Sequence, residues 1–235
     1  MTRELIVNAD DFGRTRGINR GVIHAHENGI VTTASLMVRW PAAADAADYV
    51  RASGTLGLGL HLDLGEWVYR NESWGTEYEV VDVTDPGAVE AEVGRQLAEF
   101  RRLARADPTH LDSHQHVHRN EPVRDVMRTV AAELGVPLRE EAVGIHFLGD
   151  FYGQDQDGNT FPAVIGRVRL IEIVGSLPAG ITELMCHPGL DDDSPQPYVR
   201  ERALEVDALC DPDVRAAVGA EGIVLRRFPA RATLL

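Results

Sequence analysis

ELIVNADDFG, residues 4–13, is a short apolar run that ends in two adjacent aspartates, Asp10 and Asp11. A run of this length that is rich in Leu, Ile and Val is typical of a buried strand. Two neighbouring carboxylates are costly to bury unless a cation or a set of hydrogen bonds compensates their charge. Asp11 could instead cap the helix expected from residue 16. Because the pair directly follows a buried strand, a cation site is the favoured interpretation.

Strand-like and helix-like segments alternate outward from this run along the chain. Expected strands lie at 4–9, 31–38, 56–64, 109–113, 136–140, 181–187 and 222–227. Expected helices lie at 16–28, 41–53, 86–106, 122–135 and 161–176, and residues 198–218 are expected to hold one or two helices; long loops are expected at 65–84 and 141–160. This alternation predicts a parallel sheet with crossover helices. The cluster of glycines at 54–59 lies inside a strand, which argues against a dinucleotide-binding sheet. We therefore predict one α/β domain, residues 1–235, folded as an irregular TIM-like (β/α)7 barrel.

The composition excludes several classes of function. The net charge is −14, so neither nucleic acid nor an anionic membrane is an expected partner. All 23 basic residues are arginine, which excludes lysine Schiff-base chemistry and a phosphate loop that needs lysine. No apolar stretch approaches the ~20 residues of a membrane span, and the N-terminus has no apolar signal core. Cys186 and Cys210 suggest no disulfide framework. We expect a cytoplasmic protein, and a homodimer stays open.

Polar residues follow the expected strands, at the ends where parallel barrels carry their functional side chains. They are Asp10 and Asp11 after the first strand, His61 and Asp63 in the third, Asp112 and His114 in the fourth, Arg139 in the fifth and His187 in the sixth. His61 and Asp63 are two residues apart, so on a strand they would share one face. The convergence of such residues from five strands on one rim supports a functional site there more strongly than any single residue does.

HLDSHQHVH, residues 110–118, contains four of the nine histidines of the chain. Such density suits imidazole–metal chemistry, although a run of surface histidines is the simpler alternative. On a helix, His114 and His118 would share a face, whereas on an extended segment His114, His116 and His118 would do so. The sequence does not decide between these two arrangements.

Two further residues have chemistry that would complement a metal site. His187 precedes Pro188, which holds it out of the helical region at a strand end, and a fixed histidine suits a general acid. Its alternative is a turn residue without a role. Arg139 could pair with Asp10 and keep it ionised, or form an ion pair that is only structural.

Four motifs, LIVNADDFG, GLGLHLDL, THLDSHQHVH and ELMCHPG, occur in an order that resembles the YdjC-like carbohydrate deacetylases, which include the chitooligosaccharide deacetylases. The resemblance covers nearly the whole chain. It departs at Gln115, where family members often carry histidine, and in segments 65–84 and 144–161, which do not match a chitobiose enzyme. Trp67 and the other aromatics of the first segment could stack on sugar rings or simply pack that loop.

The resemblance implies an irregular TIM-like barrel with one divalent metal ion. By this resemblance, the metal ligands are Asp11, His61 and His114. The general base corresponds to Asp10, and the general acid corresponds to His187. The implied reaction removes an N-acetyl group from an amino sugar or small oligosaccharide and releases acetate. Mg or Zn is the expected ion, and Mn, Co or Ni would also suit the ligands.

Two other functions remain open from the residues alone. One is a different barrel metallohydrolase, of amidohydrolase or phosphoesterase type, which would often hold two metal ions. The other is a sugar-binding module without catalysis, although all the candidate residues are intact.

Overall fold

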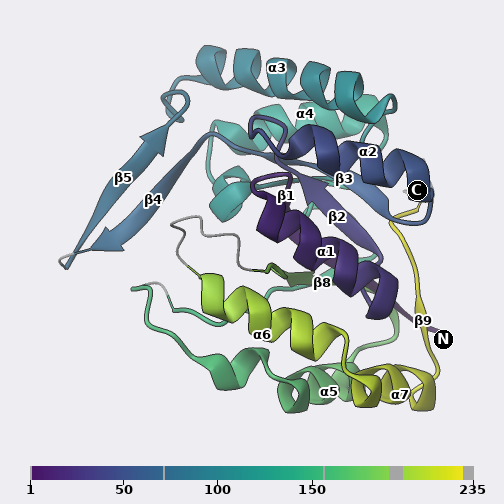
Figure 1. The fold of residues 1–235 in the computed structure, drawn as a ribbon. Helices are drawn as coiled ribbons and strands as arrows, with labels where there is room; N and C mark the ends of the chain where they lie inside the picture. The colour runs from purple at the N-terminus through teal and green to yellow at the C-terminus, as the bar shows by residue number, and fades with distance from the viewer. Residues whose placement is uncertain (1, 71, 156, 191–197, 230–235) are drawn as a thin grey trace.

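A parallel sheet forms the centre of the computed structural model, which describes residues 2–70, 72–155, 157–190 and 198–229 (Figure 1). The strands follow the order β6-β3-β2-β1-β8-β7, and β9 pairs with β1. They are β1 Arg3–Phe12, β2 Thr33–Leu36, β3 Gly57–Leu62, β6 Leu111–Ser113, β7 Ile145–Leu148, β8 Gly180–Cys186 and β9 Ile223–Leu225. Among the described residues, the strand pairings of this sheet are all parallel, as the alternation of strands and helices predicts.

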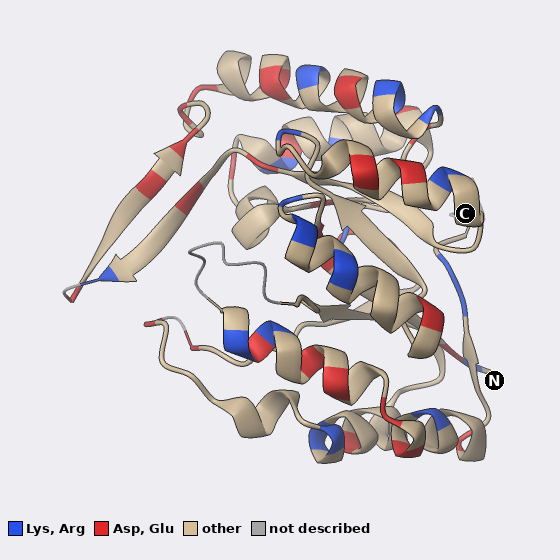
Figure 2. Cartoon of the chain, in the orientation of Figure 1, with Lys and Arg blue, Asp and Glu red and all other residues tan. Residues whose placement is uncertain are grey.

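The helices pack around the outside of this sheet (Figure 1). They are α1 Arg16–Asn28, α2 Ala43–Ser53, α3 Pro86–Ala104, α4 Val123–Leu134, α5 Arg167–Ser176, α6 Val199–Leu209 and α7 Pro212–Ala220, with 3-10 turns η1 His114–Arg119 and η2 Pro162–Ile165. Local chemistry sets several starts: Thr15 accepts a hydrogen bond from the backbone of Ile18 at the start of α1, and Asp85 caps α3. Acidic and basic residues both occur along α3 and α6 (Figure 2), and in α6 Glu201, Arg202 and Glu205 are buried.

The predicted fold class is confirmed as a curled parallel sheet that forms a half-barrel. β6 and β7 end the path of paired strands, and an isolated bridge between Leu111 and Leu138 extends the β6 side. The expected strand at 136–140 is therefore wrong, since only Leu138 pairs. β1 is central and almost wholly buried, and β8 pairs with it along residues 3–9. The two aspartates at its end thus lie in the middle of the rim.

Two expected loops contain strands. Segment 65–84 forms an antiparallel hairpin, β4 Gly65–Arg70 and β5 Ser73–Glu79, which projects from the sheet (Figure 1). β5 is almost wholly exposed, and β4 runs from buried to exposed along its length, so no alternation of buried apolar residues marks either strand. Segment 141–160 contains β7, which is only partly buried. The expected helix at 161–176 is divided at Gly166, whose backbone is extended, into η2 and α5.

Within the described residues, no helix is both long enough and apolar enough to cross a bilayer.

Candidate active site

Asp10 and Asp11 lie at the carboxyl end of β1 and line the same cavity. In a regular strand, successive side chains point to opposite faces. Here the pairing of β1 with β2 is irregular between Ala9 and Phe12, and Asp11 has a positive φ of 63°. Aspartate tolerates this left-handed conformation better than most residues. The irregular backbone therefore lets both carboxylates face the site.

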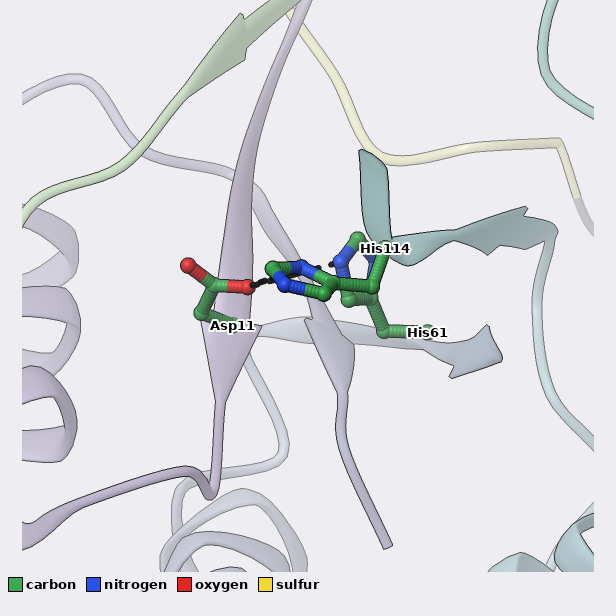
Figure 3. Close-up of side chains that lie close together, drawn as sticks. All are labelled: Asp11, His61 and His114. Atoms are coloured by element: carbon green, nitrogen blue, oxygen red, sulfur yellow. Dashed lines mark ion pairs between the residues drawn. The ribbon is translucent and has the colours of Figure 1, made fainter. Parts of the chain in front are cut away.

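Asp11, His61 and His114 converge on one point from three segments (Figure 3). Asp11 Oδ1 lies 3.5 Å from His61 Nε2 and 3.3 Å from His114 Nδ1. Ligands of a tetrahedral ion with bonds of ~2.0–2.1 Å are about 3.3 Å apart, so these separations suit a shared cation. Among the described residues, buried Asp11 Oδ1 has no hydrogen-bond partner, which a bound cation would supply. The donor set thus fits one divalent ion.

The orientation of His61 is set by Asp112. Asp112 Oδ1 lies 2.8 Å from His61 Nδ1, which leaves Nε2 facing Asp11. Histidines that bind metals commonly have their second nitrogen held by a carboxylate in this way. Burial alone would lower the pKa of His61, but Asp112 and Asp10 raise it to about 10. In the absence of a metal ion, His61 therefore carries a positive charge at the centre of the site.

The second oxygen of Asp11 is occupied by Arg202 from α6. The guanidinium donates to Asp11 Oδ2, so Oδ1 is the oxygen left for a cation. Burial would raise the pKa of Asp11, but the charge of Arg202, together with the two histidines, holds it well below its usual value. Arg202 was not predicted from the sequence, because it lies 191 residues away and no local motif marks it.

Arg139 forms an ion pair with Asp10 through two hydrogen bonds. Its Nη1 and Nη2 donate to the two Asp10 oxygens, both at 2.7 Å. The same guanidinium contacts Asp112 at 2.8 Å and Glu183 at 2.7 Å, and all four side chains are buried. Burial would raise the pKa of Asp10, but Arg139 outweighs it and the net shift is downward. Burial raises the pKa of Glu183 to about 7 despite Arg139.

His187 follows β8 and lines the same cavity as Asp10. Its Nε2 lies 3.9 Å from Asp10 Oδ2, and its ring packs near Tyr152 and Tyr198. Glu205 accepts the backbone N–H of His187 and fixes that turn. Burial lowers the pKa of His187 to about 4, so its ring is neutral near pH 7.

The run at 114–118 is neither a regular helix nor an extended segment. Gln115 and His116 have φ values of 51° and 53°, and this left-handed kink separates the histidines. His114 turns toward Asp11, whereas His118 contacts Ser113 through Nδ1 at 2.6 Å. Of the three candidates, His114 therefore lies with Asp11 and His61.

Asp63 does not share the face of His61, contrary to the expectation from spacing. β3 ends before it, and the carboxylate accepts hydrogen bonds from Arg39, Trp40 and Tyr78 at 2.9–3.0 Å. The alternation of a strand does not extend past its last residue. Asp63 thus anchors the base of the hairpin.

The sequence also did not predict Arg14 and Glu66 as residues of the site. They form a buried ion pair with each other, and His114 Nε2 lies 3.5 Å from Arg14 Nη1 and 3.9 Å from Glu66 Oε2. Their only sequence signals are the position of Arg14, three residues after Asp11, and that of Glu66, shortly after β3. The pair restrains the far side of the His114 ring.

The site opens into a cavity of about 1360 Å³. Trp67, Tyr69 and Trp74 of the hairpin line one wall, and Trp74 is 57% exposed. Gln115 holds the hairpin to η1, because its side chain accepts from the backbone N–H of Trp67 at 2.9 Å and donates to its carbonyl at 2.8 Å. Gln115 thus connects the aromatic wall of the hairpin to its neighbour in η1, His114, which lies with Asp11 and His61.

Sequence comparisons identify relatives of nearly the same length. Residues 4–220 match the model of the YdjC-like protein family. A carbohydrate deacetylase from Geobacillus stearothermophilus is 34% identical over 247 residues, which cover 96% of this chain and 96% of that protein. A chitooligosaccharide deacetylase from Serratia marcescens is 31% identical, with 97% and 99% covered.

Solved structures share the fold. A protein from Enterococcus faecalis, described as a candidate for cellobiose-phosphate cleavage, superposes with a TM-score of 0.79 at 24% identity, covering 97% of this chain and 98% of that one. A family 4 carbohydrate esterase from Streptomyces lividans, in complex with acetate, gives a TM-score of 0.58 at 14% identity, with 98% of each chain covered. The family match over 217 residues, from 4 to 220, and relatives above 30% identity confirm the resemblance carried by the four motifs. This chain belongs to the YdjC-like family.

Proposed function

We propose that this chain is a cytoplasmic, metal-dependent carbohydrate N-deacetylase that releases acetate from an N-acetylated amino sugar or small oligosaccharide. The names of its curated relatives, carbohydrate deacetylase and chitooligosaccharide deacetylase, support the reaction. The observation that carries the proposal is the unpartnered Oδ1 of Asp11, which faces two imidazoles beside Asp10 and His187 in the described part of the chain.

Asp11, His61 and His114 would hold one divalent ion, with zinc or magnesium expected and manganese, cobalt or nickel also suited to the ligands. When bound, such an ion polarises a carbonyl oxygen and lowers the pKa of water. Arg202 binds Asp11 Oδ2 and so leaves Oδ1 for the ion. Asp112 holds His61 Nδ1 and so leaves Nε2 for the ion.

Asp10 takes a proton from the water that attacks the acetamide carbonyl. Arg139 keeps Asp10 ionised and fixes both of its oxygens, so the base needs no rearrangement before it acts. The Asp10 carboxylate is buried, which excludes bulk water from competing for it. The low pKa of Asp10 makes it a weak base, so the water must itself be activated at the site.

His187 delivers a proton to the amine nitrogen as the C–N bond breaks. Because burial keeps this ring neutral at rest, it must gain its proton during the reaction. Asp10 Oδ2 is 3.9 Å from His187 Nε2 and holds the proton taken from water, so it is the nearest source. The second proton of the attacking water leaves with the products, which are acetate and the amine in its protonated form, and no net proton is lost from the side chains.

The cavity supports a sugar substrate larger than one ring. Pockets for small ligands typically enclose ~300–1,000 Å³, and this one is larger. Trp67, Tyr69 and Trp74 offer flat apolar faces, which suit the faces of sugar rings. Which acetylated sugar binds would depend on this hairpin and on the cavity-lining residues Asp150, Gln154 and Asp155.

A screen for acetate release tests the proposal. The metal-depleted protein is reconstituted with each divalent ion in turn and incubated with N-acetylglucosamine oligomers, other N-acetyl sugars and acetylated glycolipids. Release that requires the ion and disappears in Asp11→Asn is expected. Binding of an N-acetyl sugar without acetate release would favour a sugar-binding module, and hydrolysis only of phosphoesters or cyclic amides would favour the other barrel hydrolases.

A further inference from the structure

His116, His118 and Glu140 form a second cluster that the proposed reaction does not use. Each offers one possible ligand atom, and these atoms all lie within 4.8 Å of one another. His116 and His118 come from η1, and Glu140 follows Arg139 along the chain. The cluster shares no residue with the Asp11, His61 and His114 trio. The left-handed kink at Gln115 and His116 separates His114 from these two histidines.

Two buried imidazole nitrogens in this cluster have no hydrogen bond within the described part of the chain. His118 is 1% exposed; its Nδ1 is engaged by Ser113 Oγ at 2.6 Å, and its Nε2 is buried without a hydrogen bond. His116 Nδ1 is likewise buried and unbonded, and lies 3.4 Å from Glu140 Oε1. Buried nitrogens without partners are unfavourable and uncommon, so a ligand that accepts their lone pairs would explain both.

We propose that His116, His118 and Glu140 bind a second divalent transition-metal ion, of the zinc, cobalt or nickel class. Two imidazoles and one carboxylate suit these ions better than magnesium or calcium, which prefer oxygen ligands. The hydrogen bond at His118 Nδ1 leaves Nε2 as its metal-facing atom, in the manner of a histidine oriented by a second partner. His116 lines the cavity, so the ion would be reached from the same opening as the substrate.

One cation already competes for this site. Arg119 donates through Nε to both Glu140 oxygens, at 2.9 and 3.0 Å, and its side chain is 51% exposed. An exposed arginine can swing into solvent at low cost when an ion replaces it. Arg139 lies nearby over the ring of Phe147, but its charge is compensated by three carboxylates. Removal of Arg119 should therefore strengthen binding of the second ion.

Metal stoichiometry measured by equilibrium dialysis and elemental analysis tests this site. The metal-free full-length protein is titrated with Zn²⁺ and, in parallel, with Co²⁺, whose visible absorption reports its ligand field. Wild type is expected to bind two ions, and His116→Ala and Glu140→Gln one each. Arg119→Ala is expected to bind two, with a severalfold lower dissociation constant for the second. Glu141→Gln, which changes the neighbouring carboxylate that pairs with Arg128, is the matched control and should bind two.

The variant Asp11→Asn separates this proposal from the proposed function. It should keep one ion, and Asp11→Asn combined with Glu140→Gln should keep none. If Asp11→Asn keeps two ions, the proposed active site is wrong while the second site stands. One ion in wild type, two ions in Glu140→Gln, or weaker binding in Arg119→Ala would overturn the second site. Circular dichroism of each variant confirms the fold, and Glu140→Gln preserves side-chain shape, so a folded variant with two ions is decisive.

Discussion

Replacing Arg139 with methionine tests the buried charge cluster directly. The guanidinium is fully buried and contacts the carboxylates of Asp10, Asp112 and Glu183. Methionine is unbranched, apolar and uncharged, so the change removes the cation while its side chain still fills the space of the arginine's aliphatic stem. Breaking a buried ion pair by removing one partner costs ~3–5 kcal/mol, because the remaining charge is left uncompensated. For a chain of this size, a loss of about 4 kcal/mol corresponds to a midpoint of thermal unfolding lower by roughly 12 °C.

The loss should depend on pH in a defined direction. In the wild type, the folded-state pKa values of Asp10 and Asp112 lie below their usual range, so their contribution to stability is present above about pH 4 and is lost at lower pH. Without Arg139, burial raises both pKa values, and the variant loses stability as pH rises through them. The gap between wild type and Arg139→Met should therefore be widest near pH 8 and narrow toward pH 5.

Urea unfolding of the metal-free proteins at pH 5, 6.5 and 8 measures this gap. Arg128→Met removes an exposed arginine that pairs with Glu141 on the surface and should leave the unfolding midpoint unchanged at each pH. A gap below about 1 kcal/mol, or one that is the same at all three pH values, would refute the argument that Arg139 neutralises buried carboxylates.

Three further predictions concern the site. Asp10→Asn should lower turnover by about 100-fold or more while metal content is unchanged, because loss of a general base removes proton transfer alone. Loss of metal in this variant would mean that Asp10 is the metal ligand and Asp11 the general base. Burial would lower the pKa of His61, but nearby carboxylates raise it to about 10. Metal binding near pH 7.5 should therefore release about one proton from His61, and metal affinity should increase as pH rises toward 10. Calorimetry in buffers of different ionisation enthalpy would detect the released proton, and its absence would contradict the prediction. Gln115→Ala removes both hydrogen bonds to Trp67 and should raise KM roughly 3- to 10-fold with kcat nearly unchanged. Steady-state kinetics on the best substrate would check this prediction. A fall in kcat alone would show that Gln115 acts on the chemical step instead.

The hairpin shows why substrate identity is harder to predict than reaction type. β5 is exposed and β4 is only partly buried, and the position of the hairpin depends on Gln115 and Asp63, which lie outside it in the sequence. An exposed two-stranded ribbon carries no alternation of buried and exposed residues, because it has little to bury. Its aromatic wall could be recognised by composition, but its placement over the site could not.

The sequence by itself determined the architecture and the edge of the sheet on which the site lies. Alternating apolar runs specify parallel strands, and the carboxyl ends of parallel strands meet on one rim, so Asp10, His61, His114 and His187 could be expected together. The helix boundary predicted at 16–28 also agrees with α1, because a cap at Thr15 marks its start locally. These features are recorded in spacing and local chemistry.

Only the tertiary structure decided which atoms face the site. The irregularity after Ala9 turns both aspartates inward, and the kink at Gln115 selects His114 over the other two histidines. Arg202 reaches Asp11 from 191 residues away, and Asp63 turns from the site to the hairpin. Such contacts depend on how distant elements pack and on how charges pair after burial, and a local pattern of residues records neither.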